Sequence, residues 1–593
     1  MYKTFKEASQ SLDIRPVDFF FAKEVLEEIK VRYKIEQTSA NILLHLLMKL
    51  MSEYGHGHSC IRLKEVADTT VFASDIADDE PKEGFKLPEH KQLLSVLTQL
   101  NYDNLPIYFT KDFDSLYIKK LCMYEKEIAD FIKLKTVEKI KENRRIEEIV
   151  YELFESSDEI DWQKQAVIKS LSYDFSIISG GPGTGKTTTV AKLLLAMQIM
   201  ECKQQKIALL APTGKAAQRM TESLRKTLAN TIPSGLTMES IMQENEIMNY
   251  TSTPLSDLVH NASSDNYLQN LEAQTIHRFL GLRPNSKFVK YGEKTKAPFD
   301  VIIVDEASML DVNIFIKLIR AVGEDTKLIL LGDVNQLPSV EAGSLLANFT
   351  TSIDGSISKF TAKLIKNYRS QQNINNLASD VLLGDVDIAK HQNENISFYD
   401  FKWLDKQLQV YADKYKELQL SESHKEALHQ LNKFRVLVAN KNLEIGTDRL
   451  NQKIEQLLGR AKDTIYKGKP IMITQNSYSL GLFNGDVGII WPDNTGALRA
   501  YFDGKEDRAF SLNMLPQYES VYAMTIHKTQ GLEFDEVAII LPPEDNEALT
   551  KQLLYTGITR AKTKLDVISA QKIFKTVIKK DLQRNSNIAR LLS

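Results

Sequence analysis

The segment FSIISGGPGTGKTTTV, residues 175–190, decides the fold of this 593-residue chain. FSIIS at 175–179 is an apolar run typical of a buried strand, and GGPGTGKT at 180–187 fits the phosphate-binding pattern G-x-x-x-x-G-K-T before a helical run. Its glycines let backbone N–H groups surround a phosphate, Lys186 reaches the β- and γ-phosphates, and Thr187 coordinates Mg²⁺. The predicted nucleotide-binding residues of this loop are Gly180, Gly181, Pro182, Gly183, Thr184, Gly185, Lys186, Thr187 and Thr188.

Further apolar runs alternate with helical patterns on both sides of residue 350. The first set is KIALLAP at 206–212, FDVIIVDE at 299–306 and KLILLGD at 327–333. The second set is FRVLVA at 434–439, SVYAMT at 520–525, DEVAIILP at 535–542 and KLDVISA at 564–570. Continuous apolar strands alternating with helices predict parallel sheets covered on both faces. We therefore expect an α/β fold with two such domains, at 156–350 and 351–593.

The other regions differ from these two domains in their pattern of apolar and charged residues. Residues 1–115 are predicted to form a helical N-terminal partner-binding domain, with a leucine stripe at 43–50, and residues 116–155 a charged helical linker. The stretch KPIMITQNSYSLGLFNGDVGIIWP at 469–492 alternates strand and turn character, and its Asn484-Gly485 pair is a hairpin signal. A small β-barrel insertion at about 455–515 is expected.

Composition limits the environment and the mode of any nucleic-acid binding. The formal net charge is −3, so contact with nucleic acid requires a local groove. The three cysteines have no CxxC spacing, which argues against a disulfide framework and a zinc ribbon. Neither a secretion signal nor an apolar run of about 18 residues is apparent, and a cytoplasmic location is expected.

An acid pair follows the apolar strand VIIV at 301–304. Asp305 is predicted to hold Mg²⁺, and Glu306 to accept a proton from the attacking water or to orient it. Gln336, just beyond the strand KLILL, is predicted to sense the γ-phosphate, although a surface loop is the plain alternative. Arg369 in NYRS and Arg560 in LLYTGITRAKTKL are candidate arginine fingers, each of which is alternatively a surface ion pair.

The segment YAMTIHKTQGLEFDEV at 522–537 combines a glycine with polar residues after a strand. Gly531 allows close backbone approach, and Glu533 is a candidate for holding the ribose. Thr525 and His527 are placed for DNA phosphates, although a lone histidine is more often structural.

Short motifs follow one another along the chain in the order DWQKQAV, GGPGTGKT, APTGKAAQRM, TIHRFLG, VDEASM, GDVNQLPSVEAG, NYRS, TIHKTQGLEF and YTGITRAK. This ordered set resembles the motif series of superfamily 1B helicases. Within them the chain is similar to the RecD family, the α subunits of exodeoxyribonuclease V. The motifs span about 160–570, and the N-terminal region resembles the family more loosely. The resemblance implies two RecA-like P-loop motor domains and an SH3-like β-barrel insertion.

The resemblance also assigns residues. Gln163 matches the glutamine that reads adenine. Residues 283–300 are predicted as a basic β-hairpin, which either splits the duplex as the family's pin does or is a solvated hairpin. The segment GHGHSC, with His56, His58 and Cys60, becomes a structural turn, because its spacing does not suit zinc. The positions that match the DNA-facing residues are Pro212, Thr213, Lys215, Thr275, His277, Thr525 and His527.

The function implied is an ATP- and Mg²⁺-dependent 5′→3′ DNA helicase that acts with RecB- and RecC-like partners at double-strand ends. We find no acidic cluster outside the ATP site that fits a two-metal nuclease, so exonuclease activity is expected in a partner. A free-standing RecD-like helicase and an ATP-dependent regulatory subunit that does not unwind remain as alternatives.

Overall fold

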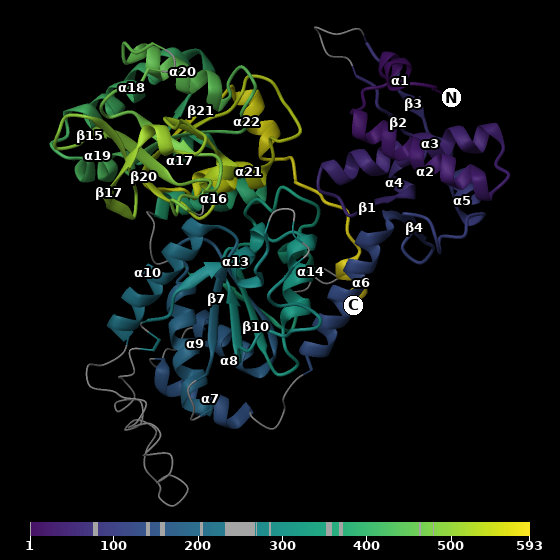
Figure 1. The fold of residues 1–593 in the computed structure, drawn as a ribbon, viewed down its shortest axis with the longest axis horizontal. Coiled ribbons are helices and arrows are strands. Elements are labelled where there is room, and N and C mark those ends of the chain that lie inside the picture. Colours follow the sequence, from purple (N-terminus) through teal and green to yellow (C-terminus); the bar gives the residue numbers. More distant parts are fainter. Residues whose placement is uncertain are drawn as a thin grey trace, which may run out of the picture.

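The computed structural model describes residues 2–74, 81–137, 143–154, 160–201, 205–231, 267–268, 270–283, 286, 288–350, 358–366, 372–461, 464–477 and 479–593. These residues form an N-terminal part and two α/β domains, which lie next to one another in Figure 1. Among them, no helix combines the length and apolar character that a membrane span requires.

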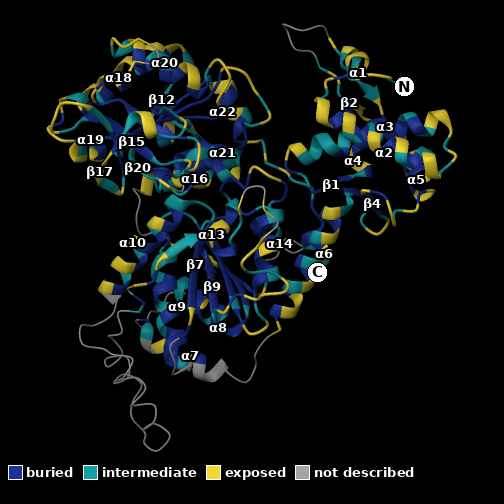
Figure 2. Ribbon diagram, in the orientation of Figure 1, coloured by how far each residue is buried: buried dark blue, intermediate teal, exposed yellow. Residues whose placement is uncertain are grey.

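The first α/β domain is built on a six-stranded parallel sheet of order β11-β6-β10-β9-β7-β8. Its strands are β6 (Phe175–Gly180), β7 (Ile207–Ala211), β8 (Ala273–Thr275), β9 (Val301–Val304), β10 (Lys327–Gly332) and β11 (Thr361–Leu364). Figure 2 shows β7 and β9 buried inside the domain. The parallel sheet predicted from the first set of apolar runs is confirmed.

Successive strand residues pack on opposite faces of this sheet because strand side chains alternate. Ile178, Leu209 and Ile303 face one core, under α7 (Asn143–Leu153), α8 (Trp162–Ser172), α9 (Lys186–Glu201) and α10 (Gly214–Thr231). Ile177 and Ile302 face the other core. The helices on that side are α6 (Lys119–Lys135), α13 (Ile276–Leu280), α14 (Val312–Ala321) and α15 (Leu345–Thr350).

The second α/β domain has a five-stranded parallel sheet of order β12-β21-β20-β13-β19. Its strands are β12 (Ile396–Tyr399), β13 (Phe434–Val438), β19 (Ala523–Thr525), β20 (Phe534–Ile540) and β21 (Ala561–Ile568). Its helices are α16 (Gln372–Leu383), α17 (Ile388–His391), α18 (Leu404–Leu420), α19 (His424–Leu431), α20 (Thr447–Leu457), α21 (Lys551–Ile558) and α22 (Gln571–Val577). The second predicted parallel sheet is confirmed as well.

An antiparallel sheet interrupts the second domain between α20 and β19. It contains β14 (Pro470–Ile473), β15 (Val487–Pro492), β16 (Leu498–Phe502), β17 (Lys505–Ser511) and β18 (Tyr518–Ser520), in the order β17-β16-β15-β14-β18. Ile471, Ile490 and Phe502 belong to its own apolar core. The sheet lies where the insertion was expected. Its two edge strands, β17 and β18, are not paired with each other in the described part of the chain, so an SH3-like barrel stays a prediction.

The N-terminal part contains strands as well as the expected helices. Its helices are α1 (Phe5–Ser11), α2 (Pro16–Arg32), α3 (Gln37–Gly55), α4 (Leu63–Val66) and α5 (His90–Thr98). Its strands are β1 (Cys60–Arg62), β2 (Thr70–Val71), β3 (Phe85–Lys86), β4 (Ile107–Thr110) and β5 (Ser115–Ile118). Strand β5 pairs with both β1 and β4 and crosses the expected boundary at 115–116. Because IYFT and SLYI are rich in aromatic and β-branched residues, they favour this hairpin over a helix.

Two segments also cross the expected boundaries of the α/β domains. Strand β11 follows residue 350 but pairs with β6 of the first domain. After α22, the chain leaves the second domain and runs to the N-terminal part, where α23 (Ile588–Leu592) packs beside α6 and α15 (Figure 1). The last residues therefore tie three parts of the protein together.

The stretch 283–300 differs from the β-hairpin that we expected. Its described residues, 283, 286 and 288–300, form turns and irregular chain without a strand. Lys290 N donates to Leu280 O at 2.8 Å, and the rings of Tyr291 and Phe299 lie 5.3 and 5.6 Å from the Phe279 ring. Aromatic packing folds this stretch back onto α13, which replaces strand pairing.

Candidate functional site

The glycine-rich loop joins β6 to α9 as the sequence predicts. Gly183 and Gly185 have φ angles of +79° and +82°, which favour glycine because other residues are strained there. Lys186 Nζ donates to the carbonyl oxygens of Gly180 and Gly181, at 2.7 and 3.1 Å, so the ammonium lies across the loop. An ammonium held over a ring of backbone amides is the arrangement that binds phosphate oxygens.

Gln163 lies beside this loop. Asp161 caps α8 by accepting hydrogen bonds from Gln163 N and Lys164 N, at 2.9 and 3.1 Å. The Gln163 side-chain amide then donates to Thr184 O at 3.4 Å. The predicted adenine-reading glutamine is thus held at the edge of the phosphate loop.

Asp305 and Glu306 follow β9 and face the loop. Asp305 N donates to Leu210 O and Glu306 N donates to Asp305 Oδ1, both at 2.8 Å. Glu306 has a φ of +50°, a strained conformation for a residue with a side chain. Burial raises the pKa of both carboxyls, and the Asp305 charge raises the pKa of Glu306 further, while Lys186 opposes both shifts. A carboxylate with a raised pKa is a better proton acceptor.

Gln336 lies in a polar network that crosses between the two domains. Its amide nitrogen donates to Asp333 Oδ2 at 3.3 Å, and the Tyr555 hydroxyl from α21 donates to the same oxygen at 2.8 Å. The buried Gln336 Oε1 has no hydrogen-bond partner within the described residues. A Cβ added to Gly181 would lie 3.0 Å from the Tyr555 hydroxyl, so this network borders the phosphate loop.

Sequence reasoning missed Asp333 and Tyr555, although both lie inside quoted motifs. Asp333 directly follows β10, just as Asp305 directly follows β9. Tyr555 lies five residues before Arg560 in the same motif. The strand-end position was an available signal for Asp333, whereas the role of Tyr555 required the contact between the domains.

Arg560 reaches the cleft from the second domain and is 2% exposed. Its Nε donates to Thr556 O and its Nη1 to Leu532 O, both at 3.0 Å, so its guanidinium is fixed by its own domain. Its positive charge opposes the rise in the pKa of Glu306. The other candidate finger, Arg369, lies outside the described residues.

Gly531 brings the second domain close to the acid pair, and Glu533 lies two residues further along the chain. Gly531 has a φ of +74°, and a Cβ there would lie 3.8 Å from Glu306 Oε1 and 3.6 Å from Ala216 Cβ. Arg219 of α10 donates from Nη1 to the Gly531 carbonyl oxygen and is a further residue that sequence reasoning missed, although it lies in the quoted motif APTGKAAQRM.

Most of these residues line one cleft of about 650 Å³, whereas its lining does not include Gln163, Gly180, Gly181, Thr184, Asp333 and Tyr555. Its first-domain residues include Pro182, Gly183, Gly185, Lys186, Thr187, Thr188, Arg219, Asp305, Glu306 and Gln336. Its second-domain residues are Gly531, Glu533, Arg560 and Lys562. The cleft therefore has one wall from each α/β domain.

The predicted DNA-facing residues follow β7 and its neighbour β8 in the first sheet and β19 in the second. Ala211 of β7 is in register with Thr275 of β8, which brings Pro212, Thr213 and Lys215 next to the start of α13. Thr213 Oγ1 accepts from Ala216 N and Thr275 Oγ1 accepts from Arg278 N, both at 3.2 Å. These hydroxyls therefore cap helix starts, where amides and hydroxyls suit phosphate contact.

A Thr-Ile-His segment recurs at the edge of each sheet. Thr275 and Thr525 have nearly the same backbone conformation, with φ −71° in both and ψ 147° and 145°. Burial lowers the pKa of His277 and of His527, and in the case of His527 the nearby Arg584 lowers it too. Both histidines are thereby favoured as neutral hydrogen-bonding groups.

The segment GHGHSC takes part in packing between domains. His58 Nε2 lies 3.1 Å from Glu53 Oε2, and its Nδ1 accepts from Asn585 N at 3.0 Å. Cys60 is buried, and Gly343 N of the first domain donates to Gly57 O at 3.0 Å. The described residues contain no group of three or more His, Cys, Asp or Glu side chains placed to hold a metal.

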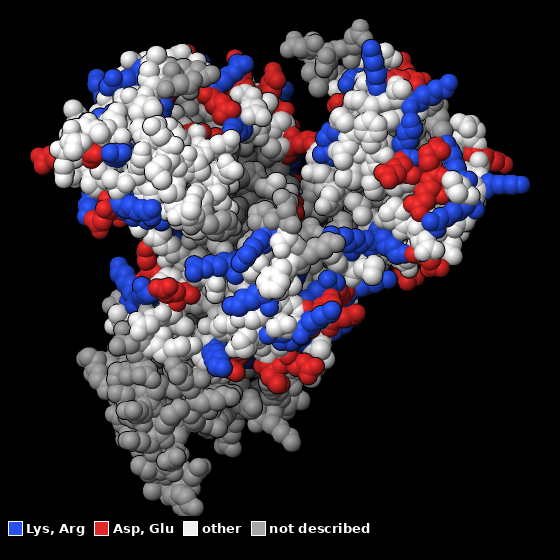
Figure 3. Space-filling view, viewed as in Figure 1, with Lys and Arg blue, Asp and Glu red and all other residues white. Residues whose placement is uncertain are grey.

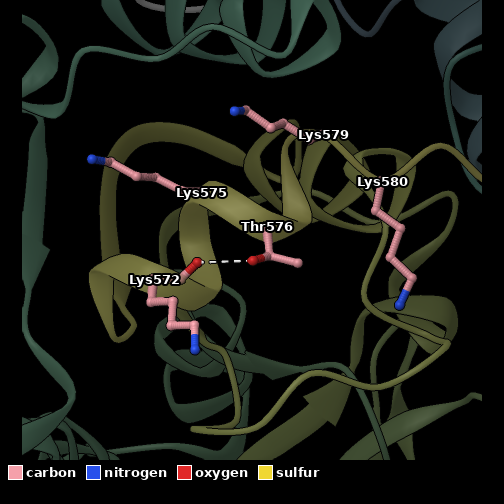
Figure 4. A pocket seen from close by; sticks show the side chains of 5 residues that line it. All are labelled: Lys572, Lys575, Thr576, Lys579 and Lys580. Carbon is pink, nitrogen blue, oxygen red and sulfur yellow. Dashed lines mark hydrogen bonds between the residues drawn. The ribbon is translucent and has the colours of Figure 1, made fainter.

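A second cavity, of about 530 Å³, lies on α22 and the turn after it (Figure 4). Its lining is basic and consists of Lys572, Lys575, Thr576, Lys579 and Lys580. The ends of the lysine side chains lie apart from one another in Figure 4, so they form a basic surface without a convergent site. Figure 3 also shows basic side chains over α13 and α14, whereas charges of both signs are mixed elsewhere on that face.

Two parallel α/β domains facing each other across a phosphate loop, an acid pair and a buried arginine define an ATP-driven helicase motor. Comparison of the chain with known protein families agrees with this class of protein. Residues 161–397 match an AAA domain, residues 520–568 a UvrD-like helicase C-terminal domain, and residues 11–103 the N-terminal domain of the RecBCD enzyme subunit RecD. The chain is an ATP-binding DNA helicase.

Full-length relatives give the particular family. The chain is 30% identical to the RecBCD enzyme subunit RecD of Haemophilus influenzae, over 97% of both chains. It is 34% identical to the Mycolicibacterium smegmatis RecBCD enzyme subunit RecD, over 72% of this chain and 74% of that protein. Similarity to the ATP-dependent RecD2 DNA helicase of Deinococcus radiodurans is 25%, over 65% of this chain and 46% of that protein. The chain belongs to the RecD family, which confirms the resemblance drawn from its motifs.

Proposed function

We propose that this chain is the 5′→3′ helicase subunit of a RecBCD-type exodeoxyribonuclease V, which processes double-strand DNA ends for recombinational repair. The observation that carries the proposal is the shared cleft, in which Lys186 and Glu306 of one domain face Arg560 of the other. Binding and loss of a triphosphate between such walls closes and opens the domains around a single strand.

The proposed ATP chemistry assigns one task to each side chain. Lys186 binds the β- and γ-phosphates, and Arg560, with Arg369, stabilises charge on the transferring phosphoryl group. Glu306 accepts a proton from the attacking water or orients it, which its raised pKa favours. Gln336 senses the γ-phosphate through its free oxygen, and its link to Asp333 and Tyr555 carries the signal to the second domain.

A magnesium site at Thr187 and Asp305 fits the residues present. A hydroxyl and a carboxylate line the cleft next to Lys186, and Mg²⁺ prefers such oxygen ligands. When bound, the ion neutralises charge on the β- and γ-phosphates. Gln163 and Glu533 are proposed to hold the adenine and the ribose at the two ends of the nucleotide.

DNA contact is proposed at the ends of β7, β8 and β19. Thr213, Thr275 and Thr525 offer hydroxyls at strand ends, and neutral His277 and His527 offer ring N–H groups. Contacts of this kind follow the phosphate backbone and do not read bases, so no sequence preference is expected. We further propose that the antiparallel insertion is the SH3-like barrel, because a register shift between Ala500 and Phe502 bends its sheet.

RecB- and RecC-like subunits are the proposed partners, with nuclease activity in one of them, and the cytoplasm is the proposed location. The N-terminal RecD match and the 97% mutual coverage with a RecBCD subunit support this assembly. A free-standing helicase is less well supported, because the chain covers only 46% of the RecD2 relative.

The polarity and the assembly have separate tests. A strand-displacement assay with matched 5′- and 3′-tailed duplexes should show unwinding from the 5′ tail, and unwinding confined to the 3′ tail would contradict the polarity. Lys186→Gln should abolish DNA-stimulated ATP hydrolysis, with thermal unfolding unchanged as the control for folding. Co-purification from the native host tests the assembly, and a strictly monomeric, fully processive enzyme would contradict it.

A further inference from the structure

The antiparallel insertion contacts the first α/β domain at the start of α10. The turn Asp503-Gly504, between β16 and β17, places Asp503 Oδ2 3.2 Å from Lys215 Nζ. Lys215 is one of the residues predicted to face DNA, and it lies at the start of α10, shortly after β7 and Thr213. A carboxylate from a different part of the chain is therefore paired with a proposed phosphate-binding ammonium.

The turn fits closely against α10. Gly504 has a φ of +74°, and a Cβ added there would lie 2.4 Å from Gln218 Nε2. A Cβ added to Gly214, at the start of α10, would lie 4.0 Å from Phe483 Cβ, in the loop between β14 and β15. Two separate turns of the insertion thus rest on the same helix start.

Asp503 is held in place by the insertion itself. Its N donates to Val487 O at 3.1 Å, within the sheet. The neighbouring Lys505 pairs with Asp486 at 2.8 Å. The Asp503 carboxylate pairs instead with Lys215 of α10. The carboxylate is thus part of a folded turn rather than the end of a loose loop.

The surroundings of Asp503 favour an anion. The Lys215 side chain is 20% exposed. The negative charge of Asp503 acts to raise the pKa of Lys215, and also that of Arg219 and Arg435. A partly buried ammonium needs a neighbouring negative charge, because burial without one is unfavourable. In the protein alone that charge is Asp503, and in a DNA complex a phosphate has the same charge and the same oxygen acceptors.

We propose that Asp503 occupies the place of a DNA phosphate on Lys215, so that the insertion forms a closed gate over the start of α10 which single-stranded DNA must displace. This inference rests on the proposed role of Lys215 in DNA binding. The gate lowers the apparent affinity for DNA, because part of the population is closed and does not bind.

Asp503→Asn removes the competing charge and keeps the side-chain size. The matched control is Asp507→Asn, which makes the same charge change in the same insertion, at a side chain that is 91% exposed and paired with Lys425. In the full-length protein without nucleotide, fluorescence anisotropy with a labelled oligo(dT) should show Kd for Asp503→Asn about three- to tenfold below wild type. Asp507→Asn should stay within about twofold of wild type, since an exposed charge contributes about 1 kcal/mol or less.

The outcomes separate the gate from the role of Lys215. Lys215→Ala should weaken oligo(dT) binding, and wild-type affinity in that variant would refute the DNA role of Lys215 and the gate with it. A weakened Lys215→Ala together with an unchanged or weakened Asp503→Asn would refute the gate alone. In that case Asp503 would serve to position Lys215 for DNA.

A disulfide tests the movement directly. A Cβ–Cβ distance of 4.0 Å suits a disulfide in the double variant Gly214→Cys/Phe483→Cys. The oxidised protein should lose at least about tenfold in oligo(dT) affinity, and reduction of the same sample should restore it. Equal affinity before and after reduction would show that the contact need not open for DNA to bind.

Discussion

The Tyr555 hydroxyl donates a 2.8 Å hydrogen bond to Asp333 Oδ2, and this bond joins the two α/β domains next to the phosphate loop. Asp333 also accepts from the amide of Gln336, the proposed γ-phosphate sensor. A second link lies alongside, where Leu337 N donates to Thr556 Oγ1 at 3.0 Å. Gln336, the proposed γ-phosphate sensor, and α21, which ends two residues before Arg560, are therefore parts of one hydrogen-bonded network.

Tyr555→Phe removes this link and leaves the ring in place. We expect kcat for DNA-stimulated ATP hydrolysis to fall about tenfold, which corresponds to about 1.4 kcal/mol in the barrier, with little change in nucleotide affinity. Tyr411→Phe is the matched control, because the Tyr411 hydroxyl donates to Asp566 at 3.0 Å entirely within the second domain. Equal losses of kcat in both variants would mean that Tyr555 has no role in coupling the domains.

Gly531→Ala tests the close approach of the second domain to Glu306. At a φ of +74° alanine is strained by about 1 kcal/mol, and its methyl group would lie 3.8 Å from Glu306 Oε1. The methyl excludes water from the carboxylate, so we expect ATP hydrolysis to fall by tenfold or more. Gly496→Ala, with a φ of +82° and no atom within 4 Å of the added carbon, should show a similar loss of stability in urea unfolding and full activity. Full activity in Gly531→Ala would contradict the proposed approach.

The sequence predicted features that depend on neighbours along the chain. The loop 180–187, the acid pair 305–306 and the apolar strands each carry their own local pattern, and the structure places Lys186, Glu306, Gln336 and Arg560 in one cleft as expected. Residue spacing within a motif sets local geometry, which is why these predictions succeed.

Features made by contacts between distant segments were missed. Tyr555 and Arg219 matter because of partners in the opposite domain, and nothing in their own motifs gives those partners. Lys215 was predicted to face DNA, but its pairing with Asp503 depends on how the insertion folds back, which its own motif does not show. The N-terminal strands were missed because a strong leucine stripe in α3 outweighed two short aromatic runs.

The pKa of Glu306 sets the expected pH dependence of hydrolysis. Burial and the neighbouring Asp305 raise this pKa, so Glu306 stays protonated to a higher pH than an ordinary glutamate, whose pKa is about 4.3. Proton acceptance requires the carboxylate, and activity is therefore lost as the pH falls through the raised value. We expect an acid limb in a plot of kcat against pH, at a higher pH than an ordinary glutamate would give. A profile without this acid limb would contradict the role of Glu306 as base, and Gly531→Ala should move the limb to higher pH.

The C-terminal tail should hold the N-terminal part on the motor. Asn587 is fully buried, its N donates to Glu125 Oε2 and its Nδ2 to Ser115 Oγ, each at 3.1 Å, and Ser586 Oγ donates to Glu125 Oε1 at 2.7 Å. Asn587→Ala leaves buried polar groups unpaired, which costs about 1–3 kcal/mol. We expect a lower midpoint in urea unfolding and faster proteolysis between the N-terminal part and the first domain. Arg590→Ala, on the exposed side of α23, is the control and should match the wild type. Wild-type stability and protease resistance in Asn587→Ala would show that the tail does not clamp the three parts together.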